Sequence, residues 1–359
     1  HLVTLDPVAV ELVDDTMIEL ARSIPIFQPT VEEAVRGNPA ALLLVEFAEE
    51  DMAENERRLR QLHEMMGDLG FGWDKGTARR GGVVDAIEPG VQGRIAEWRK
   101  SGLNIMMSEK SEAKPVSFLE DCAVELKDLA EYTDKLTAIF DRNGVKGTWY
   151  AHASVGCLHV RPVLNMKQVG GAETMRAIAE EAFELVRSFG GSHSGEHGDG
   201  IVRSEFNDRM FGPVLPDLFR QVKAMFDSQG MFNPGKITDA PKMDERELFR
   251  FAPGYEAEDF DSVLDWAAWP GAAGGFQGAV EMCNNNGACR KLSGGVMCPS
   301  YRATRNERDA VRGRANSLRL AMSGQLGPDA MASDAMAETM KLCVSCLLYT
   351  SPSPRDFEA

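Results

Sequence analysis

The chain has 359 residues, of which 43% are hydrophobic and 26% are charged, as in a globular protein with two domains. Its net charge of −16 argues against direct nucleic-acid binding, because phosphate contacts need clustered Lys and Arg. The longest apolar run, residues 40–45, is too short to span a membrane. The sequence begins at His1 without a signal peptide, so we expect a cytoplasmic protein with an upstream segment missing. Peripheral association with the inner face of the membrane stays open.

Residues 1–240 are predicted to form one α+β domain, with a mostly antiparallel sheet covered by helices on one face. Helical periodicity marks five segments: Asp6–Ser23, Asp51–Gly67, Ser117–Asn143, Ala172–Phe189 and Leu215–Ser228. Short runs typical of strands are Ala41–Phe47, Thr148–His152 and Leu158–Leu164. Gly190 and Gly191 provide the expected stop for the fourth helix.

The composition changes after residue 240. Residues 241–280 are predicted to be a linker, because Pro, Gly and small residues replace the periodic pattern. Residues 281–346 are predicted to be a small, mainly helical segment with a helix at 309–322. The tail, residues 347–359, looks like translated sequencing-adapter read-through, and we expect it to be non-native.

Five of the seven cysteines lie in this C-terminal segment. They form two groups, Cys283-x5-Cys289-x8-Cys298-Pro299 and Cys343-x2-Cys346. Thiolates bind iron–sulfur clusters, and a Cys-Pro ending is typical of [4Fe–4S] motifs. The pattern therefore predicts the start of a ferredoxin-like domain, with structural zinc and free buried thiols as the alternatives. Cys122 and Cys157 stand alone and are predicted to be small core residues.

Two histidines, a glutamate and a further histidine lie on glycine-rich segments. His152 and His159 are seven residues apart, so they share one face only if the chain turns between them, as residues 154–157 allow. Glu196 follows on a loop with three glycines. His152, His159 and Glu196 are candidate ligands of a divalent metal such as Zn or Mn, with His197 as a base. Ordinary strand and loop residues, or a zinc hydrolase, would fit the same spacing.

These segments resemble the C-terminal, substrate-side domain of the FAD-linked oxidases, which include D-lactate and D-2-hydroxyglutarate dehydrogenases and glycolate oxidase subunits. The resemblance rests on His152…His159, Gly195-Glu-His-Gly198 and Asn233-Pro-Gly-Lys236, in the family's order. It implies metal ligation by His152, His159 and Glu196, and proton removal from the substrate hydroxyl by His197. It also implies that Asn233, Gly235 and Lys236 lie against the flavin.

The chain departs from the family within the first motif. Most members read His-x-Gly-Asp-Gly-Asn-x-His, whereas Ser154-Val-Gly-Cys157 stands here in the middle. With the cysteine segment, this variant resembles bacterial fusions of a flavin enzyme with an iron–sulfur domain. A carboxylate substrate also needs a cation. Arg99 and Lys114 sit roughly where relatives place such groups, and each could equally be a solvated surface charge.

The resemblance implies FAD-dependent oxidation of a D-2-hydroxy acid, either D-2-hydroxyglutarate or D-lactate, to the 2-oxo acid. Electrons would pass from flavin to a [4Fe–4S] cluster and on to a quinone, a cytochrome or an electron-transfer flavoprotein. Residues 1–140 contain no glycine-rich pyrophosphate-binding unit, so we expect a fragment that lacks its FAD-binding domain and is inactive alone. The alternatives are a non-catalytic electron-transfer or docking subunit and the zinc-dependent hydrolase.

Overall fold

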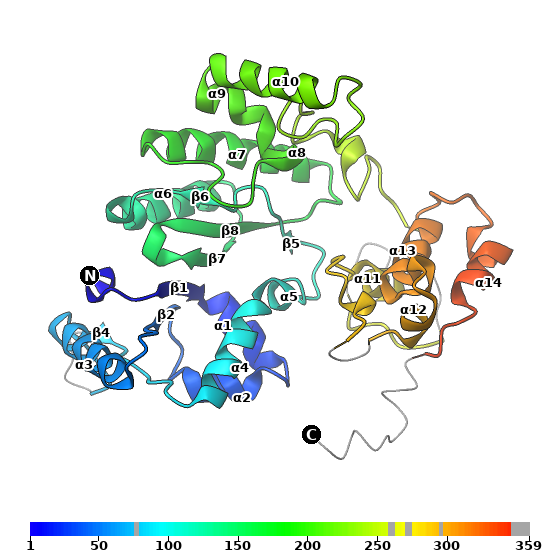
Figure 1. Cartoon of the computed structure of the whole chain (residues 1–359). Coiled ribbons are helices and arrows are strands. Elements are labelled where there is room, and N and C mark those ends of the chain that lie inside the picture. Colours follow the sequence, from blue (N-terminus) through cyan, green and yellow to red (C-terminus); the bar gives the residue numbers. More distant parts are fainter. Residues whose placement is uncertain (75–78, 258–262, 270–274, 294–296, 346–359) are drawn as a thin grey trace. The chain divides into compact units, whose positions relative to one another are not determined.

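The computed structural model describes residues 1–74, 79–257, 263–269, 275–293 and 297–345. The chain divides into two compact units. Unit 1 comprises residues 1–109 and 113–253, and unit 2 comprises residues 110–112 and 254–359 (Figure 1). Among the described residues, no helix is both long enough and apolar enough to cross a membrane.

An antiparallel sheet forms the centre of unit 1. Its strand order is β2-β1-β7-β8-β5, and β6 also pairs with β8. Each of these pairings is antiparallel, which confirms the predicted α+β class. The strands are β1 (Ala9–Asp14), β2 (Ala41–Glu46), β5 (Lys114–Pro115), β6 (Cys122–Ala123), β7 (Gly147–His152) and β8 (Cys157–Leu164). A separate parallel pair joins β3 (Phe71–Gly72) to β4 (Arg79–Arg80).

Helices cover both faces of this sheet, so the prediction of helices on one face was wrong. The helices of unit 1 are α1 (Asp15–Ser23), α2 (Gln28–Ala34), α3 (Met52–Asp68), α4 (Pro89–Lys100), α5 (Gly102–Met106), α6 (Leu129–Arg142), α7 (Gly170–Ser188), α8 (Gly200–Arg203), α9 (Asn207–Phe211) and α10 (Val214–Phe226). One core packs Ala151 and Val160 of the sheet against Leu136 of α6 and Ile178 of α7. The other packs Val13 against α1, Trp98 of α4 and Ile105 of α5.

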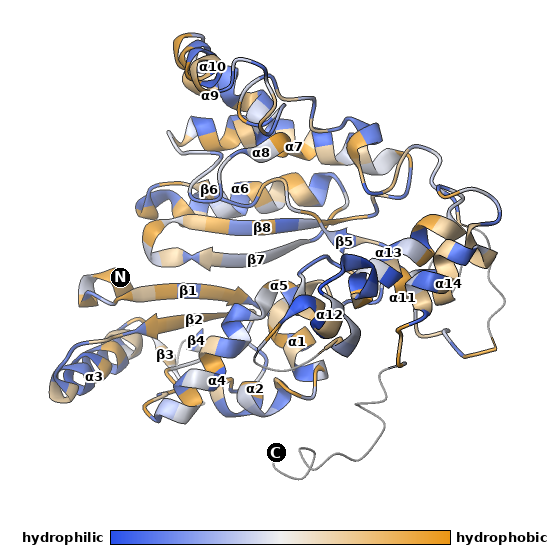
Figure 2. Ribbon diagram, turned by 45° about the vertical axis from the view of Figure 1, so that its right-hand side comes forward, coloured by the Kyte–Doolittle hydropathy of each residue, from blue (hydrophilic) through white to orange (hydrophobic). Residues whose placement is uncertain are grey.

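Alternation along β1 links the two cores. Leu12 packs against the first core and Val13 belongs to the second, because successive side chains of a strand point to opposite faces. Strand β1 therefore carries apolar side chains on both faces, and Figure 2 colours much of its ribbon as hydrophobic. This double burial removes the alternating pattern by which sequence analysis recognises a strand.

Two of the predicted helices are wrong in part. The segment predicted as a helix from Asp6 to Ser23 is strand β1 followed by helix α1, which begins after Asp14. Asp14 is the N-cap, because its side chain accepts the backbone N–H of Met17 at 2.9 Å. The segment Ser117–Asn143 is helical as α6 only from Leu129, and its first part contains β6. The other predicted helices and strands of unit 1 are confirmed within a few residues.

Unit 2 is small and mainly helical where it is described. Its helices are α11 (Gly275–Glu281), α12 (Pro299–Thr304), α13 (Val311–Met322) and α14 (Asp334–Met340), and α13 matches the helix predicted at 309–322. Cys289, Cys298, Tyr301 and Ala310 form one hydrophobic cluster. A second cluster contains Ala321, Ala330 and Met336.

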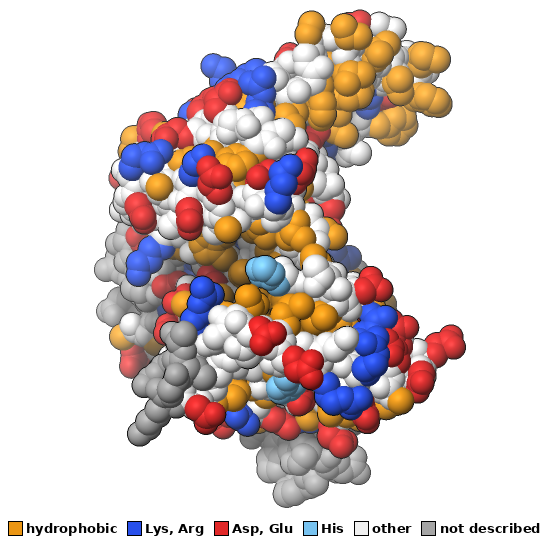
Figure 3. All heavy atoms as spheres, turned by 90° about the vertical axis from the view of Figure 1, so that its left-hand side faces the viewer, with side chains coloured by type: hydrophobic (Ala, Val, Ile, Leu, Met, Phe, Trp, Pro, Cys, Tyr) orange, Lys and Arg blue, Asp and Glu red, His pale blue; other side chains and the backbone are white. Residues whose placement is uncertain are grey.

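Two surface features of unit 1 lie on its helices. Helix α10 exposes a row of apolar side chains, and hydrophobic spheres gather over α9 and α10 at the top of Figure 3. This row comprises Val214, Leu215, Leu218, Val222, Met225 and Phe226.

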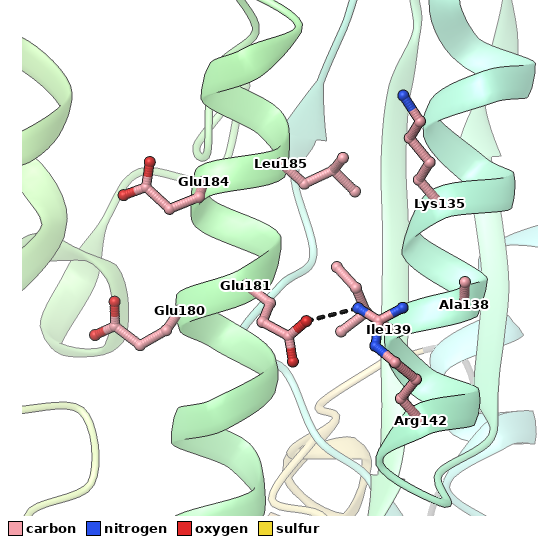
Figure 4. A pocket seen from close by; sticks show the side chains of 8 residues that line it. All are labelled: Lys135, Ala138, Ile139, Arg142, Glu180, Glu181, Glu184 and Leu185. Atoms are coloured by element: carbon pink, nitrogen blue, oxygen red, sulfur yellow. Dashed lines mark hydrogen bonds and ion pairs between the residues drawn. The ribbon is translucent and has the colours of Figure 1, made fainter.

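An open groove lies between α6 and α7, where Arg142 pairs with Glu181 at 2.6 Å (Figure 4). The groove is lined by surface charges and lies on the sheet face opposite the histidines described next.

Candidate functional site

A tight hairpin brings His152 and His159 to one face of the sheet. Residues 153–155 form a 3-10 turn between β7 and β8, so His152 pairs with Cys157 and Tyr150 pairs with His159. Gly156 completes the turn with φ 73°, and a Cβ atom there would lie 2.1 Å from the carbonyl oxygen of Val124. The predicted turn is therefore present, and only glycine fits it.

The loop that carries Glu196 and His197 is fastened to the edge of the same sheet. After α7, Gly190 takes φ 67° and Ser192 exchanges two backbone hydrogen bonds of 2.9 Å with Ala123. Gly191 permits this approach, because a Cβ atom would lie 2.4 Å from the carbonyl oxygen of Ala123. The glycines therefore both end the helix and deliver the loop to the site.

The three predicted metal ligands converge on one point. Oε1 of Glu196 lies 3.2 Å from Nε2 of His152 and 2.9 Å from Nε2 of His159. Two imidazole nitrogens and a carboxylate are the donor set of catalytic sites for Zn and related divalent metals. This donor set and its convergence fit a metal ion.

Glu11 on β1 supports this site, and sequence analysis missed it. Its carboxylate is buried and lies 2.8 and 2.9 Å from Nδ1 of His152. A carboxylate behind the second ring nitrogen is the usual support of a metal-binding histidine, since it fixes the tautomer that leaves Nε2 free for the ion. Glu11 could have been found as the acidic residue among Val10, Leu12 and Val13. It was missed because this strand was predicted as part of a helix.

Arg99 lies at this site, at the last turn of α4. Its Nη2 atom is 2.6 Å from Oε1 of Glu11, and its guanidinium lies 6.0 Å from the ring centre of Tyr150. Although burial opposes the charge, the hydrogen bond to Glu11 raises the pKa of Arg99. The side chain remains 37% exposed. Arg99 is therefore a fixed cation at the edge of the histidine cluster.

The surroundings of His159 favour the neutral form of its imidazole. Burial, together with the nearby His152 and His197, lowers its pKa. Its ring stacks on that of His197 at 4.7 Å between centroids and on that of Tyr150 at 5.6 Å. A neutral imidazole can bind a metal ion without first losing a proton.

A second acidic residue, Asp121, holds the loop of Glu196 and His197 through backbone hydrogen bonds. It is fully buried, and its carboxylate accepts the backbone N–H groups of Glu196 at 2.8 Å and of His197 at 2.7 Å. Although burial opposes ionisation, these two hydrogen bonds lower the pKa of Asp121. Among the described residues, donor atoms of Asp121, Cys157, His159 and Glu196 lie within 4.8 Å of one another.

Cys157 is a buried neutral thiol beside these ligands. Burial, together with Asp121 and Glu196, raises its pKa to about 12. Its sulfur lies 3.6 Å from Oδ1 of Asp121 and 3.7 Å from Oε1 of Glu196. The predicted description of Cys157 as a small buried residue holds, but it contacts the site and is not part of a distant core.

His197 lies next to the predicted metal ligands with its ring 44% exposed. Its Nδ1 is 3.5 Å from Oε1 of Glu120, and its Nε2 is 4.0 Å from Oε1 of Glu196. Glu120 is itself buried and forms an ion pair with Arg161 of β8. The sequence pattern gave no reason to single out Glu120 or Arg161.

The remaining predicted site residues lie elsewhere in unit 1. Lys114 pairs with Leu164, five residues along β8 from His159, which corresponds to about 17 Å of strand. The ammonium group of Lys114 donates to the carbonyl oxygen of Glu109. The structure therefore brings Arg99, but not Lys114, to the histidines.

The predicted flavin-contacting residues form an exposed turn after α10. Asn233 and Gly235 have φ values of 46° and 72°, and Lys236 donates to the side chain of Asn233 at 3.5 Å. Phe232, which precedes this turn, is 67% exposed. An exposed turn flanked by an apolar ring is suited to lie against a flat aromatic cofactor, so Asn233, Gly235 and Lys236 stay a prediction for the flavin.

The cysteines of unit 2 are only partly gathered. Cys289 and Cys298 share one hydrophobic cluster, and the Cys298 thiol donates to the carbonyl oxygen of Asp309 at 3.0 Å. The Cys283 thiol donates to the side chain of Asn285 at 3.7 Å, and Cys343 is exposed. Cys346 lies outside the described residues. No cysteine described in unit 2 belongs to a close group of metal donors.

A protein-family model matches most of unit 1. The model of the FAD linked oxidases, C-terminal domain, covers residues 3–237, which include each histidine, carboxylate and arginine of the site. The chain belongs to the FAD linked oxidases.

Relatives that match most of this FAD linked oxidase chain include D-2-hydroxyglutarate dehydrogenases. That of Pantoea ananatis is 31% identical over 331 residues, which is 89% of this chain and 30% of the relative. That of Escherichia coli is 32% identical over 321 residues, or 87% of this chain and 30% of the relative. The D-lactate dehydrogenase of Archaeoglobus fulgidus is 30% identical over 132 residues, or 37% of this chain and 29% of the relative.

The chain spans about a third of the length of these relatives. The family model ends at residue 237, so a match of 331 residues must continue into unit 2. The match to the D-lactate dehydrogenase is short enough to fit within the family domain. Unit 2 is therefore part of the likeness to the D-2-hydroxyglutarate dehydrogenases.

Proposed function

We propose that this chain is the substrate-side domain of an FAD-dependent dehydrogenase that oxidises a D-2-hydroxy acid to the 2-oxo acid. The observation that supports this proposal best is the convergence of His152, His159 and Glu196 beside His197 in a domain of the FAD linked oxidase family. D-2-hydroxyglutarate is the preferred substrate and D-lactate the second, because the matches that continue into unit 2 carry the former name.

Each residue of the site takes one role in this reaction. His152, His159 and Glu196 would hold a divalent metal, which when bound polarises the substrate hydroxyl and lowers its pKa. His197 accepts the hydroxyl proton on Nε2, the nitrogen that faces the ligands. Arg99 binds a substrate carboxylate with its exposed edge while Glu11 holds its other side. FAD supplies the acceptor of the hydride that leaves C2.

Two parts of the proposal concern the rest of the protein. The flavin would be held mainly by a domain outside this chain and would meet Asn233, Gly235 and Lys236. Electrons would leave through a [4Fe–4S] cluster bound by unit 2 to a quinone, a cytochrome or an electron-transfer flavoprotein. This route rests on the spacing of the cysteines in the sequence, because among the described residues Cys289 and Cys298 share only a hydrophobic cluster.

The role of His197 is tested by substitution in the complete flavoprotein. We expect His197→Ala to lower turnover of D-2-hydroxyglutarate by about 10²- to 10⁴-fold, the usual worth of a positioned acid or base. The visible absorbance of bound flavin should not change. His63→Ala is the matched control, because His63 is exposed on α3 and pairs with Asp85. Wild-type turnover by His197→Ala would reject the proposed base.

A further inference from the structure

We propose that Glu120, neutralised by Arg161, is the positioning residue that fixes the tautomer and orientation of His197. This inference rests on the proposed function, because it concerns the same base. It assigns a role to two residues that belong neither to the metal ligands nor to the carboxylate anchor. Both come from segments that sequence analysis did not connect with the site, namely the stretch before β6 and the middle of β8.

The charge of Glu120 is buried between two partners. Its side chain is 10% exposed, with Oε2 on the guanidinium of Arg161 and Oε1 facing Nδ1 of His197 at 3.5 Å. A buried carboxylate is costly unless it is paired, and Arg161, itself only 15% exposed, provides the opposite charge. The arrangement is a row of cation, carboxylate and imidazole. It is built like the supports that orient catalytic histidines elsewhere.

Besides Glu120, only the more distant carboxylate of Glu196 faces a ring nitrogen of His197 among the described residues. Its backbone N–H is held by Asp121 and its face stacks on His159, and neither contact involves a ring nitrogen of His197. A carboxylate opposite Nδ1 favours the Nδ1–H tautomer and leaves the lone pair on Nε2. The carboxylate of Glu196 lies opposite Nε2 but is farther away, at 4.0 Å against 3.5 Å for Glu120 and Nδ1, so Glu120 decides the tautomer. The lone pair on Nε2 then points towards the proposed metal ligands, where the substrate hydroxyl would lie.

The position of Glu120 is itself tightly fixed. Its carbonyl oxygen accepts Nη1 of Arg203 at 2.5 Å, and Arg203 also donates to the carbonyl oxygen of Gly198 in the histidine loop. The next residue, Asp121, has φ 90°, a conformation that non-glycine residues rarely adopt and that persists only where surrounding contacts enforce it. Backbone strain next to a buried functional carboxylate fits a segment shaped for placement of side chains.

The first test compares kinetic constants in the complete flavoprotein. Glu120→Met removes the acceptor, and we expect kcat to fall by about ten- to a hundredfold with little change in KM. Glu120→Gln keeps an acceptor oxygen and should recover part of this loss. Glu125→Gln is the control, because Glu125 lies five residues away, is exposed and forms an ion pair with Lys127. Wild-type kcat in Glu120→Met would overturn the proposal.

A double substitution separates positioning from mere packing. Glu120→Met leaves Arg161 without its carboxylate, so part of its effect could come from an unpaired buried charge. The variant that combines Glu120→Met with Arg161→Met removes both charges and should regain thermal stability. We expect its kcat to stay as low as that of Glu120→Met. Recovery of kcat together with stability would show a structural role only and reject the inference.

The tautomer itself can be measured without turnover. The ¹⁵N spectrum of histidine-labelled chain, recorded where imidazoles are neutral and assigned with His197→Ala, should show Nδ1 of His197 protonated. Glu120→Met should convert it to a mixture of tautomers. An unchanged spectrum would contradict the role of Glu120 even if turnover fell. If His197→Ala keeps full turnover, the proposed function fails; if only the Glu120 variants do, this inference alone fails.

Discussion

Two buried carboxylates, Glu11 and Asp121, hold the residues of the site in place. Glu11 supports His152 from β1, and Asp121 holds the backbone of the histidine loop from the segment before β6. Motif spacing in the sequence predicted the histidines and Glu196, because those residues lie in recognisable glycine-rich segments. It could not predict Glu11 and Asp121, since their roles depend on strand pairing between residues more than seventy positions apart.

The support from Glu11 predicts a change in metal affinity. Glu11→Gln keeps the size of the side chain but removes the charge that faces Nδ1 of His152, so Zn²⁺ affinity should fall about ten- to a hundredfold. Isothermal titration of the purified chain with Zn²⁺ measures this. Glu19→Gln on the exposed face of α1 provides the control. Equal affinity of Glu11→Gln and wild type would show that His152 needs no carboxylate partner.

At the scale of elements, the β7–β8 hairpin determines the geometry of the site. A strand alone would send His152 and His159 to opposite faces, and the turn at residues 153–156 corrects this by inserting four residues. Glycine spacing made this turn predictable from sequence. Strand β1 was not predictable, because burial on both faces erased its alternation and the acidic residues gave it a helical appearance.

The turn glycine gives a stability prediction with an internal control. Gly144→Ala has a similar φ of 66° but open space around the new methyl group, so it should cost about 1–2 kcal/mol of backbone strain. Gly156→Ala adds a clash with the carbonyl oxygen of Val124 and should cost clearly more. Urea unfolding of both variants measures the difference. Equal losses would mean that the hairpin shifts without resistance.

The turn after α10 has a pH-dependent anchor. Asp227 accepts the side chain of Lys223 at 2.6 Å and the backbone N–H groups of Phe232 and Met231 at 2.8 and 2.9 Å. These contacts lower its pKa to about 2. The pKa of an aspartate in the unfolded chain is about 3.9. The stabilisation is therefore complete above that value and is lost as pH falls through about 2.

Amide exchange at this turn tests the expectation. Protection factors of the Met231 and Phe232 amides, corrected for intrinsic exchange, should decrease as pH falls from about 4 towards 2. Asp227→Asn should show low protection throughout. Asp217→Asn on the exposed side of α10 should follow the wild type. A pH-independent protection factor in the wild type would show that the carboxylate does not hold the turn.

At the scale of the whole molecule, the resemblance carried by three short motifs identified the family that the comparison with known proteins shows. Family and fold class were accessible because the motifs lie in one order along residues 152–236 and the helices are strongly periodic. The arrangement of cysteines in unit 2 was less accessible. Short helices and glycine-rich connections there give little periodicity, and Cys346 lies beyond the described residues.

The apolar row on α10 affects how this protein behaves in solution. Val222, Met225 and Phe226 are each more than half exposed, and the chain's net charge of −16 opposes the approach of two copies. At 0.1 M salt that repulsion decays over a distance of about 10 Å. Sulfate in addition strengthens apolar association. Purified protein will therefore be colloidally most stable in dilute buffer and will cluster as ionic strength rises, so the conditions chosen for storage decide whether single molecules or aggregates are measured.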